Sequence, residues 1–291
     1  MSADDTGARL FVGLQYLLPQ HLLSGLVHWL ARVELPWVKN ALIDNFVVNY
    51  RPDLSEAEEP DPRKYASFNA FFTRALRAGA RPVDAAPGAL VSPVDGTVSQ
   101  IGRTDGSSLV QAKGLSYTLE ALLDERAPKW AAAFQGGAFA TLYLAPHNYH
   151  RIHMPLAGAL QAAWYVPGQL FSVNATTASQ VPGLFARNER VVCVFAQGSL
   201  SFALVLVGAL FVGSMATVWH GDVTPRSPRV RGELPLEFVR ADLKLEKGAE
   251  LGRFNMGSTV ILLLPPGRTE WLAELSAGST VRVGQTLARL T

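Results

Sequence analysis

The sequence predicts an α+β protein in which N-terminal amphipathic helices precede a β-rich domain with barrel-sandwich-like hairpins. Two observations support this prediction. Residues 10–31 lack Asp, Glu, Lys and Arg and repeat leucine at helical spacing. From about residue 88, short runs rich in Val, Leu, Thr and Phe are separated by Gly, Pro, Asn and Asp, which is typical of strands joined by turns. Helices therefore precede strands and do not alternate with them.

The N-terminal apolar segment is long enough to span a bilayer, but its middle is interrupted. The interrupting residues are polar or proline: Gln15, Pro19, Gln20 and His21. We therefore predict two short helices, with Trp29 suited to a membrane–water interface. Residues 1–62 are expected to form membrane-associating helices and a linker, and residues 63–291 the catalytic β-rich domain. The alternative for the helices is a hairpin packed on the protein's own core.

The linker and the segment after it carry opposite charge. Residues 51–62 hold five acidic residues and three prolines, whereas residues 63–81 hold five basic residues and no acid. Aromatic residues recur at helical spacing in the second segment, which predicts an amphipathic helix. Its basic side would face either water or anionic lipid.

The β-rich part contains seven predicted strand runs and one helix near residues 118–124. The runs cover residues 89–102, 108–112, 138–145, 159–166, 190–197, 200–218 and 258–264. Two segments, 91–98 and 275–287, resemble the hairpins of biotinyl and lipoyl barrel sandwiches. Neither has a lysine at its tip, which argues against a swinging-arm carrier.

Composition limits the possible partners. The 291-residue chain has a net charge of +2, which gives no electrostatic argument for nucleic acid. Charged residues make up only 17% and the mean hydropathy is +0.15, which favours contact with a membrane surface. The single cysteine, Cys193, excludes an intrachain disulfide and a cysteine-based zinc cluster.

Three of the six histidines, His147, His150 and His153, lie in one short stretch. Flanking prolines and the lack of a nearby carboxylate argue against a metal site, so no metal is expected. An imidazole is the natural proton carrier near neutral pH, and the cluster therefore predicts catalysis. We expect His147 to be a structural histidine, and His150 and His153 to face opposite sides of a strand.

Two further residues have chemical potential. Asp95 precedes a glycine in an apolar run and is either a turn residue or a carboxylate that orients a histidine. The Gly257–Ser258 pair directly precedes a fully apolar strand. A serine hydroxyl held there could attack the preceding carbonyl, because glycine presents no side chain that obstructs it.

Five short motifs follow one another in the region 65–290: VDG (Val94–Gly96), YHRIHMP (Tyr149–Pro155), FSVN (Phe171–Asn174), LFARNER (Leu184–Arg190) and GRFNMGSTV (Gly252–Val260). Together they resemble the bacterial type of phosphatidylserine decarboxylase, and FFTR (Phe71–Arg74) and QAKG (Gln111–Gly114) also fit. The family commonly has leucine where this chain has Met256, a change that conserves volume.

The resemblance implies a cofactor made from the chain itself. Ser258 would attack the Gly257 carbonyl, the chain would break by β-elimination, and Ser258 would become a covalent pyruvoyl group. The product would be a heterodimer of a β chain (1–257) and an α chain (258–291), with a homodimer also possible. Asp95 and His153 would assist Ser258 in processing and His150 would serve decarboxylation, although the two histidines could exchange roles.

The resemblance also implies the substrate and its site. Phosphatidylserine would be decarboxylated to phosphatidylethanolamine and CO2 on a peripheral protein at the cytoplasmic face of the inner membrane. The candidate substrate-binding residues are Phe171, Ser172, Asn174 and Arg187, with Arg190 an alternative partner for the phosphodiester. Competing interpretations are a serine hydrolase using Ser258, His153 and Asp95, a pyruvoyl decarboxylase of a soluble amino acid, and a membrane-bound scaffold without catalysis.

Overall fold

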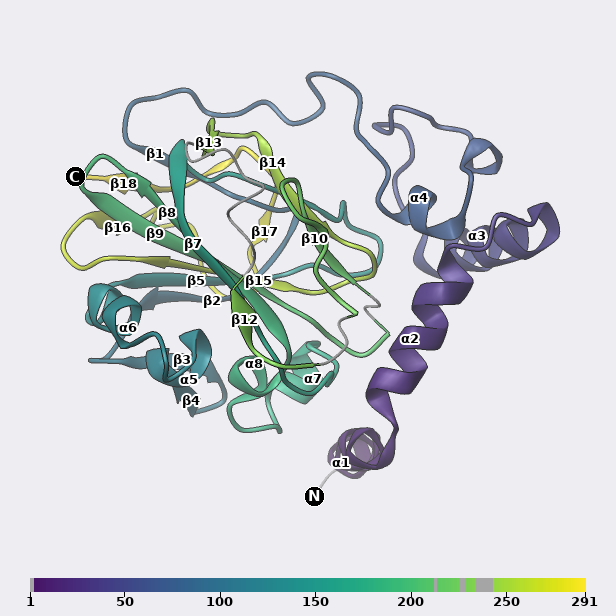
Figure 1. Ribbon diagram of the computed structural model, residues 1–291, viewed down its shortest axis with the longest axis horizontal. Helices are drawn as coiled ribbons and strands as arrows, with labels where there is room; N and C mark the ends of the chain where they lie inside the picture. Colours follow the sequence, from purple (N-terminus) through teal and green to yellow (C-terminus); the bar gives the residue numbers. More distant parts are fainter. Residues whose placement is uncertain (1–2, 212–213, 226–228, 234–242) are drawn as a thin grey trace.

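The computed structural model describes residues 3–211, 214–225, 229–233 and 243–291, and it confirms the α+β class (Figure 1). Three helices at the N-terminus stand beside a β-rich body, with short helices at its margins. The helices are α1 (Ala3–Leu17), α2 (Gln20–Ala31), α3 (Pro36–Tyr50), the 3-10 turn η1 (Pro62–Lys64), α4 (Phe68–Phe72), α5 (Leu119–Leu123), α6 (Pro128–Phe134), α7 (Ala175–Ala178) and α8 (Leu184–Arg187). The helix expected near 118–124 is therefore confirmed as α5.

Within the described residues the largest sheet is antiparallel, in the order β12-β7-β8-β9-β15-β5-β2-β17, with β13 also paired to β7. Its strands are β2 (Gly96–Arg103), β5 (Ala138–Tyr143), β7 (Gly158–Val166), β8 (Arg190–Gln197), β9 (Leu200–Val207), β12 (Gly232–Glu233), β13 (Lys244–Leu245), β15 (Thr259–Leu264) and β17 (Thr280–Val281). Every residue of β15 is buried between β5 and β9, which makes this strand the centre of the core.

Smaller sheets complete the body. One has the order β11-β10-β14-β6, another β1-β18-β16, and β3 and β4 form a two-stranded ribbon. Their strands are β1 (Ala89–Val91), β3 (Ser108–Ala112), β4 (Leu115–Thr118), β6 (Arg151–His153), β10 (Met215–Thr217), β11 (Gly221–Asp222), β14 (Glu250–Phe254), β16 (Thr269–Trp271) and β18 (Thr286–Leu290). Each predicted run contains at least one strand, and residues 212–213 of the run 200–218 lie outside the described residues.

The two segments that resemble barrel-sandwich hairpins pair with each other. Gly96 and Thr97 of β2 face Val281 and Thr280 of β17, and β1 pairs with β18. The C-terminal segment is thus joined to the rest of the chain through β15, β17 and β18 together. This arrangement matters for any reaction that cuts the chain before β15.

The N-terminal helices separate at Pro19, as predicted, and their axes bend by 86°. No single described helix is long and apolar enough to cross a membrane. Taken together, the two helices of this bent pair have the length and apolar composition of a membrane span. Large apolar side chains on both helices face solvent, including Leu17 at 83% and Leu22 at 73% exposure. An exposed leucine face of this size is a candidate membrane contact.

The expectation of one amphipathic helix over residues 63–81 is wrong. Only Phe68–Phe72 is α-helical, and its phenylalanines pack on Phe46 of α3 in a small second core. Arg74 is buried and Arg81 forms ion pairs inside the protein, so these arginines do not make a solvated basic side. The helix ends at Phe72, and the Thr73 N–H closes it on the Asn69 carbonyl.

Candidate active site

The Gly257–Ser258 peptide lies at the N-terminal end of β15, where two neighbouring strands hold it. Ser258 is fully buried, and its carbonyl accepts a hydrogen bond of 2.8 Å from the Leu144 N–H. Its hydroxyl donates to the carbonyl of Val207, at the end of β9. The hydroxyl is therefore fixed next to its own peptide and shielded from water.

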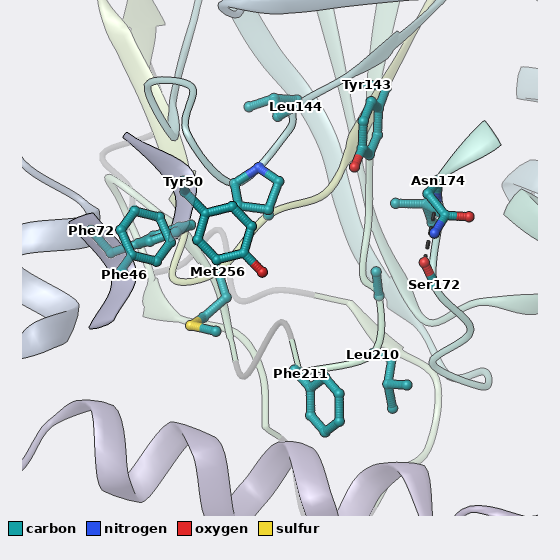
Figure 2. Close-up of a pocket in the computed structure, with 14 residues that line it drawn as sticks. Phe46, Tyr50, Phe72, Tyr143, Leu144, Ser172, Asn174, Leu210, Phe211 and Met256 are labelled. Atoms are coloured by element: carbon teal, nitrogen blue, oxygen red, sulfur yellow. Dashed lines mark hydrogen bonds between the residues drawn. The ribbon is translucent and has the colours of Figure 1, made fainter. Parts of the chain in front are cut away.

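A pocket of about 210 Å³ opens beside this peptide (Figure 2). Its lining is mostly apolar or aromatic and includes Gly257 itself. Figure 2 shows Tyr50 and Phe72 on one side of the pocket and Ser172 and Asn174 on the other. Of the predicted substrate-binding residues, Ser172 and Asn174 thus share a cavity with the candidate cleavage site.

The buried His150 ring lies behind Gly257. A Cβ atom placed on Gly257 would lie 3.6 Å from His150 Cε1, and the imidazole stacks on Phe72 with ring centroids 4.1 Å apart. His150 Nε2 donates to the Pro146 carbonyl at 3.1 Å, so Nδ1 carries the lone pair. Nδ1 is buried and has no partner among the described residues.

Burial lowers the pKa of His150 to about 3, because the buried ring cannot be solvated when it is charged. The imidazole is therefore neutral at physiological pH. Its Nδ1 carries no proton, and the lowered pKa makes this nitrogen a weak base as long as the ring stays buried.

His153 lies in a different hydrogen-bond network. Its Nδ1 donates to the Gly248 carbonyl at 2.8 Å, and its Nε2 accepts from the Tyr149 hydroxyl at 3.1 Å. Burial lowers the pKa of His153, partly opposed by the hydrogen bond to Gly248. Both ring nitrogens are thus occupied. The expectation that His150 and His153 face opposite sides of one strand is wrong, because β6 begins at Arg151 and His150 precedes it.

Asp95 lies in the turn before β2 and binds an arginine. Arg81 Nε donates to Asp95 Oδ1 at 2.9 Å and Nη2 donates to Oδ2 at 2.5 Å, while the Val283 N–H also donates to Oδ1 at 2.9 Å. Burial alone would lower the pKa of the Arg81 guanidinium, but Asp95 and Glu56 raise it. The next position, Gly96, requires glycine, because a Cβ there would lie 2.3 Å from the Tyr143 carbonyl oxygen.

The structure therefore brings His150 together with Gly257 and Ser258. Asp95 lines one surface pocket and His153 lines a second, and Arg81 and Tyr149 line both of these pockets. Among the described residues, neither Asp95 nor His153 has a hydrogen bond to Ser258. Their assistance in processing stays a prediction. Sequence reasoning placed Arg81 only among the basic residues that could approach anionic lipid, and it gave the Tyr149 hydroxyl no role; only the position of Tyr149 beside His150 could have suggested one.

Phe171 and Arg187 lie outside the pocket, next to α1. The buried Phe171 ring meets Tyr16 edge-on at 4.7 Å, and the Arg187 guanidinium lies 5.3 Å from the Phe171 ring centroid. Arg187 is exposed and donates to the Tyr16 hydroxyl at 3.3 Å. Any contact of Arg187 with substrate would therefore occur at the surface near α1.

Two expectations about individual residues are wrong. Arg190 is buried and its guanidinium donates to the carbonyls of Ala121, Leu122, Ala186 and Asn188, so it is a structural residue and not a phosphodiester ligand. His147, expected to be structural, is exposed because it lies on the loop before β6, and His150 is the buried histidine.

The residues present fit a pyruvoyl group made from Ser258. Gly257, the residue before this position, lines the cavity, and the His150 ring, whose Nδ1 has no partner among the described residues, lies behind Gly257. No three His, Cys, Asp or Glu side chains gather as metal ligands in the part of the chain that the structure describes.

A buried Gly–Ser peptide, a neutral imidazole beside it and an apolar pocket define an enzyme whose site is built around its own backbone. A phosphatidylserine decarboxylase family model matches residues 68–289, and a second model, named PSD, matches residues 10–51. The chain belongs to the phosphatidylserine decarboxylase family, which confirms the resemblance found in its motifs.

Relatives with the name phosphatidylserine decarboxylase proenzyme cover almost the whole chain. The protein of Ectopseudomonas mendocina (strain ymp) is 54% identical over 96% of this chain and 97% of its own. The protein of Pseudomonas fluorescens (strain Pf0-1) is 52% identical over 97% and 98%, respectively. The protein of Methylococcus capsulatus (strain ATCC 33009 / NCIMB 11132 / Bath) is 50% identical over 96% of both chains.

Proposed function

We propose that this protein is a pyruvoyl-dependent enzyme that decarboxylates phosphatidylserine to phosphatidylethanolamine and CO2 after cutting its own chain between Gly257 and Ser258. The observation that carries the proposal is the Gly257–Ser258 peptide beside His150, in which Gly257 lines the pocket and Ser258 is buried. The proenzyme names of relatives that cover almost the entire chain support the same reaction.

In the processing reaction, Ser258 Oγ bonds to the Gly257 carbonyl carbon and the peptide C–N bond breaks, which converts the amide into an ester. Loss of the Ser258 Cα proton then breaks the Cβ–O bond and releases the Gly257 carboxylate. Water replaces the remaining nitrogen, which leaves as ammonia. The reaction consumes one water molecule and needs no oxidant.

Strand pairing supports a stable heterodimer after cleavage. The new α chain, residues 258–291, would contain β15, β16, β17 and β18. β15 is paired on both sides and all six of its residues are buried, so the fragment stays in the core of the β chain. The apolar surface of this strand favours retention by the hydrophobic effect.

The chain's own residues support a division of labour between the two histidines. His150, whose buried Nδ1 has no partner among the described residues and whose ring lies behind Gly257, would hold or return a proton during turnover. We infer that His153 acts in processing with Asp95, because β6 pairs with β14, which leads directly to Gly257. A pyruvoyl group would supply the electron sink that decarboxylation of an amino acid requires.

Ser172 and Asn174 are the proposed polar contacts for the substrate headgroup. Phe171 and Arg187 stay proposed substrate residues, with Arg187 at the surface and the buried Phe171 ring under its guanidinium. We further propose that residues 1–62 associate with the membrane and that residues 63–291 form the catalytic domain. The exposed leucines of α1 and α2 support peripheral attachment, which we assign to the cytoplasmic face of the inner membrane.

Intact mass under denaturing conditions, combined with CO2 release from phosphatidylserine vesicles, tests the proposal. Wild-type protein should give two fragments divided at residue 258, and Ser258→Ala should give one chain without activity. Borohydride with phosphatidylserine should label only the 258–291 fragment. A single uncut wild-type chain that releases CO2 would contradict the proposal, and an uncut chain that hydrolyses esters without releasing CO2 would favour the serine hydrolase.

A further inference from the structure

Three polar side chains on the otherwise apolar helices α1 and α2 are buried. They are Gln15, Gln20 and Ser24. Each side-chain oxygen accepts a hydrogen bond from a backbone N–H about 150 or more residues away in the sequence. The three pairs are Gln15 with Ser172 at 2.8 Å, Gln20 with Leu170 at 2.7 Å and Ser24 with Phe211 at 3.2 Å. The residues that interrupt the apolar segment thus have partners in the catalytic body.

These three amides belong to the two loops that form one wall of the pocket. Residues 172–174 and 209–211 line the cavity beside Gly257, and Figure 2 shows Ser172 and Phe211 among its lining side chains. The helices therefore contact the pocket through the backbone of its wall. A shift of α1 or α2 would move that wall directly.

The loop amides depend on these side chains. In the described ranges, the N–H groups of Leu170, Ser172 and Phe211 donate to no backbone carbonyl. A buried N–H without an acceptor is costly, so removal of the acceptor favours opening of the loop. Each of the three side chains is thus the acceptor on which its loop amide depends.

Further contacts fix the position of the helices against the loop that contains Gly168 and Ser172. The Gln20 amide also donates to the Gln15 carbonyl at 2.8 Å, which closes the bend between α1 and α2. His21 Nε2 donates to the Gly168 carbonyl at 2.9 Å. A Cβ on Gly168 would lie 2.4 Å from the Arg187 carbonyl oxygen, so the loop is seated tightly on the body.

We propose that the bend between α1 and α2 clamps the pocket wall in its productive position, with Gln15, Gln20 and Ser24 as positioning residues. None of the three lines the pocket, and each acts through the loop backbone that it holds. The effect of the clamp on substrate turnover rests on the proposed function, whereas the clamp itself rests only on the hydrogen bonds. The helices would then shape the site in addition to any contact with lipid.

Amide hydrogen exchange of the processed protein tests the clamp directly. In Gln20→Met, which keeps the side-chain length but removes the acceptor, the Leu170 amide should exchange about tenfold faster. Gln161→Met is the matched control, because Gln161 is exposed on β7 and, among the described residues, its side chain donates only to the carbonyl of Ala159. Unchanged exchange at Leu170 in Gln20→Met would overturn the proposal.

Kinetics on monomeric dihexanoyl phosphatidylserine test the catalytic consequence. Ser24→Ala removes the hydroxyl but favours the helix, so a loss of activity cannot come from a weaker helix. We expect kcat/KM to fall about threefold to tenfold in Ser24→Ala and Gln20→Met, with complete processing by intact mass, and to recover in Ser24→Thr. Because this substrate needs no bilayer, the fall should equal that on vesicles.

Two outcomes would overturn the catalytic consequence. Variants that are fully processed and keep wild-type kcat/KM would show that the loops do not need the clamp. A defect confined to vesicles would make the bend a membrane anchor only. If wild-type protein released no CO2, the proposed function would fail, and the exchange of the Leu170 and Phe211 amides would still decide whether the clamp exists.

Discussion

Replacement of Asp95 by asparagine should destabilise the protein by about 2–3 kcal/mol, because Asp95 forms a buried ion pair. The side chains of Arg81 and Asp95 are only 11% and 9% exposed, and two nitrogens of Arg81 bind the two oxygens of the carboxylate. Loss of one partner of a buried pair costs about 3–5 kcal/mol. Arg81 keeps Glu56 at 2.8 Å and asparagine keeps an acceptor for the Val283 N–H, so we expect a smaller loss.

Urea unfolding of Ser258→Ala protein measures this loss without interference from chain cleavage. A double-mutant cycle of Asp95→Asn with Arg81→Met should give a coupling energy of about 2 kcal/mol. The control pair is Arg63 with Asp44, which has the same kind of contact at 2.9 Å but side chains 55% and 48% exposed. The control should give less than about 1 kcal/mol. Equal coupling in both pairs would refute the role given to burial.

Two further predictions concern the sheet and a buried acid. Gly96→Ala should lower the free energy of unfolding by about 1–3 kcal/mol and slow processing, because its Cβ would clash with the Tyr143 carbonyl. Gly102→Ala is the control, since a Cβ there has open space around it and should be tolerated. Urea unfolding and intact mass compare the two variants. Burial raises the pKa of Glu189 from 4.5 to about 7, so the folded state keeps a proton that the unfolded state loses between these values. Stability should therefore fall as the pH rises from about 4.5 to 7, and Glu189→Gln should remove this slope; an unchanged slope in urea titrations would contradict the assignment.

Local sequence patterns predicted the elements whose conformation depends on their own residues. The run 190–197 coincides with β8, and the run 258–264 contains β15, because continuous apolar sequence is what a strand buried on both faces requires. Pro19 marked the break between the first two helices. The position of Ser258 at the start of the central strand followed from the same pattern.

The failures share one cause, which is that the deciding partner lies far away in the sequence. Residues 63–81 have helical spacing, but Arg81 is drawn inward by Asp95 and Glu56. Arg190 carries a charge that suits a phosphodiester, yet backbone carbonyls of α5 and α8 use its donors. Helix α3 was not predicted because its apolar residues do not fall on one face, and Trp37 is exposed although Ile43 is buried.

The histidines show why a motif alone could not divide the chemistry. His150 and His153 are three residues apart, yet Nδ1 of the first has no partner among the described residues and the second has both nitrogens occupied. The difference arises because β6 begins between them and pairs with β14, which directs His153 toward Tyr149 and Gly248. His150 precedes the strand and packs on Phe72, so only its ring can meet a group formed at residue 258 without a change of partners.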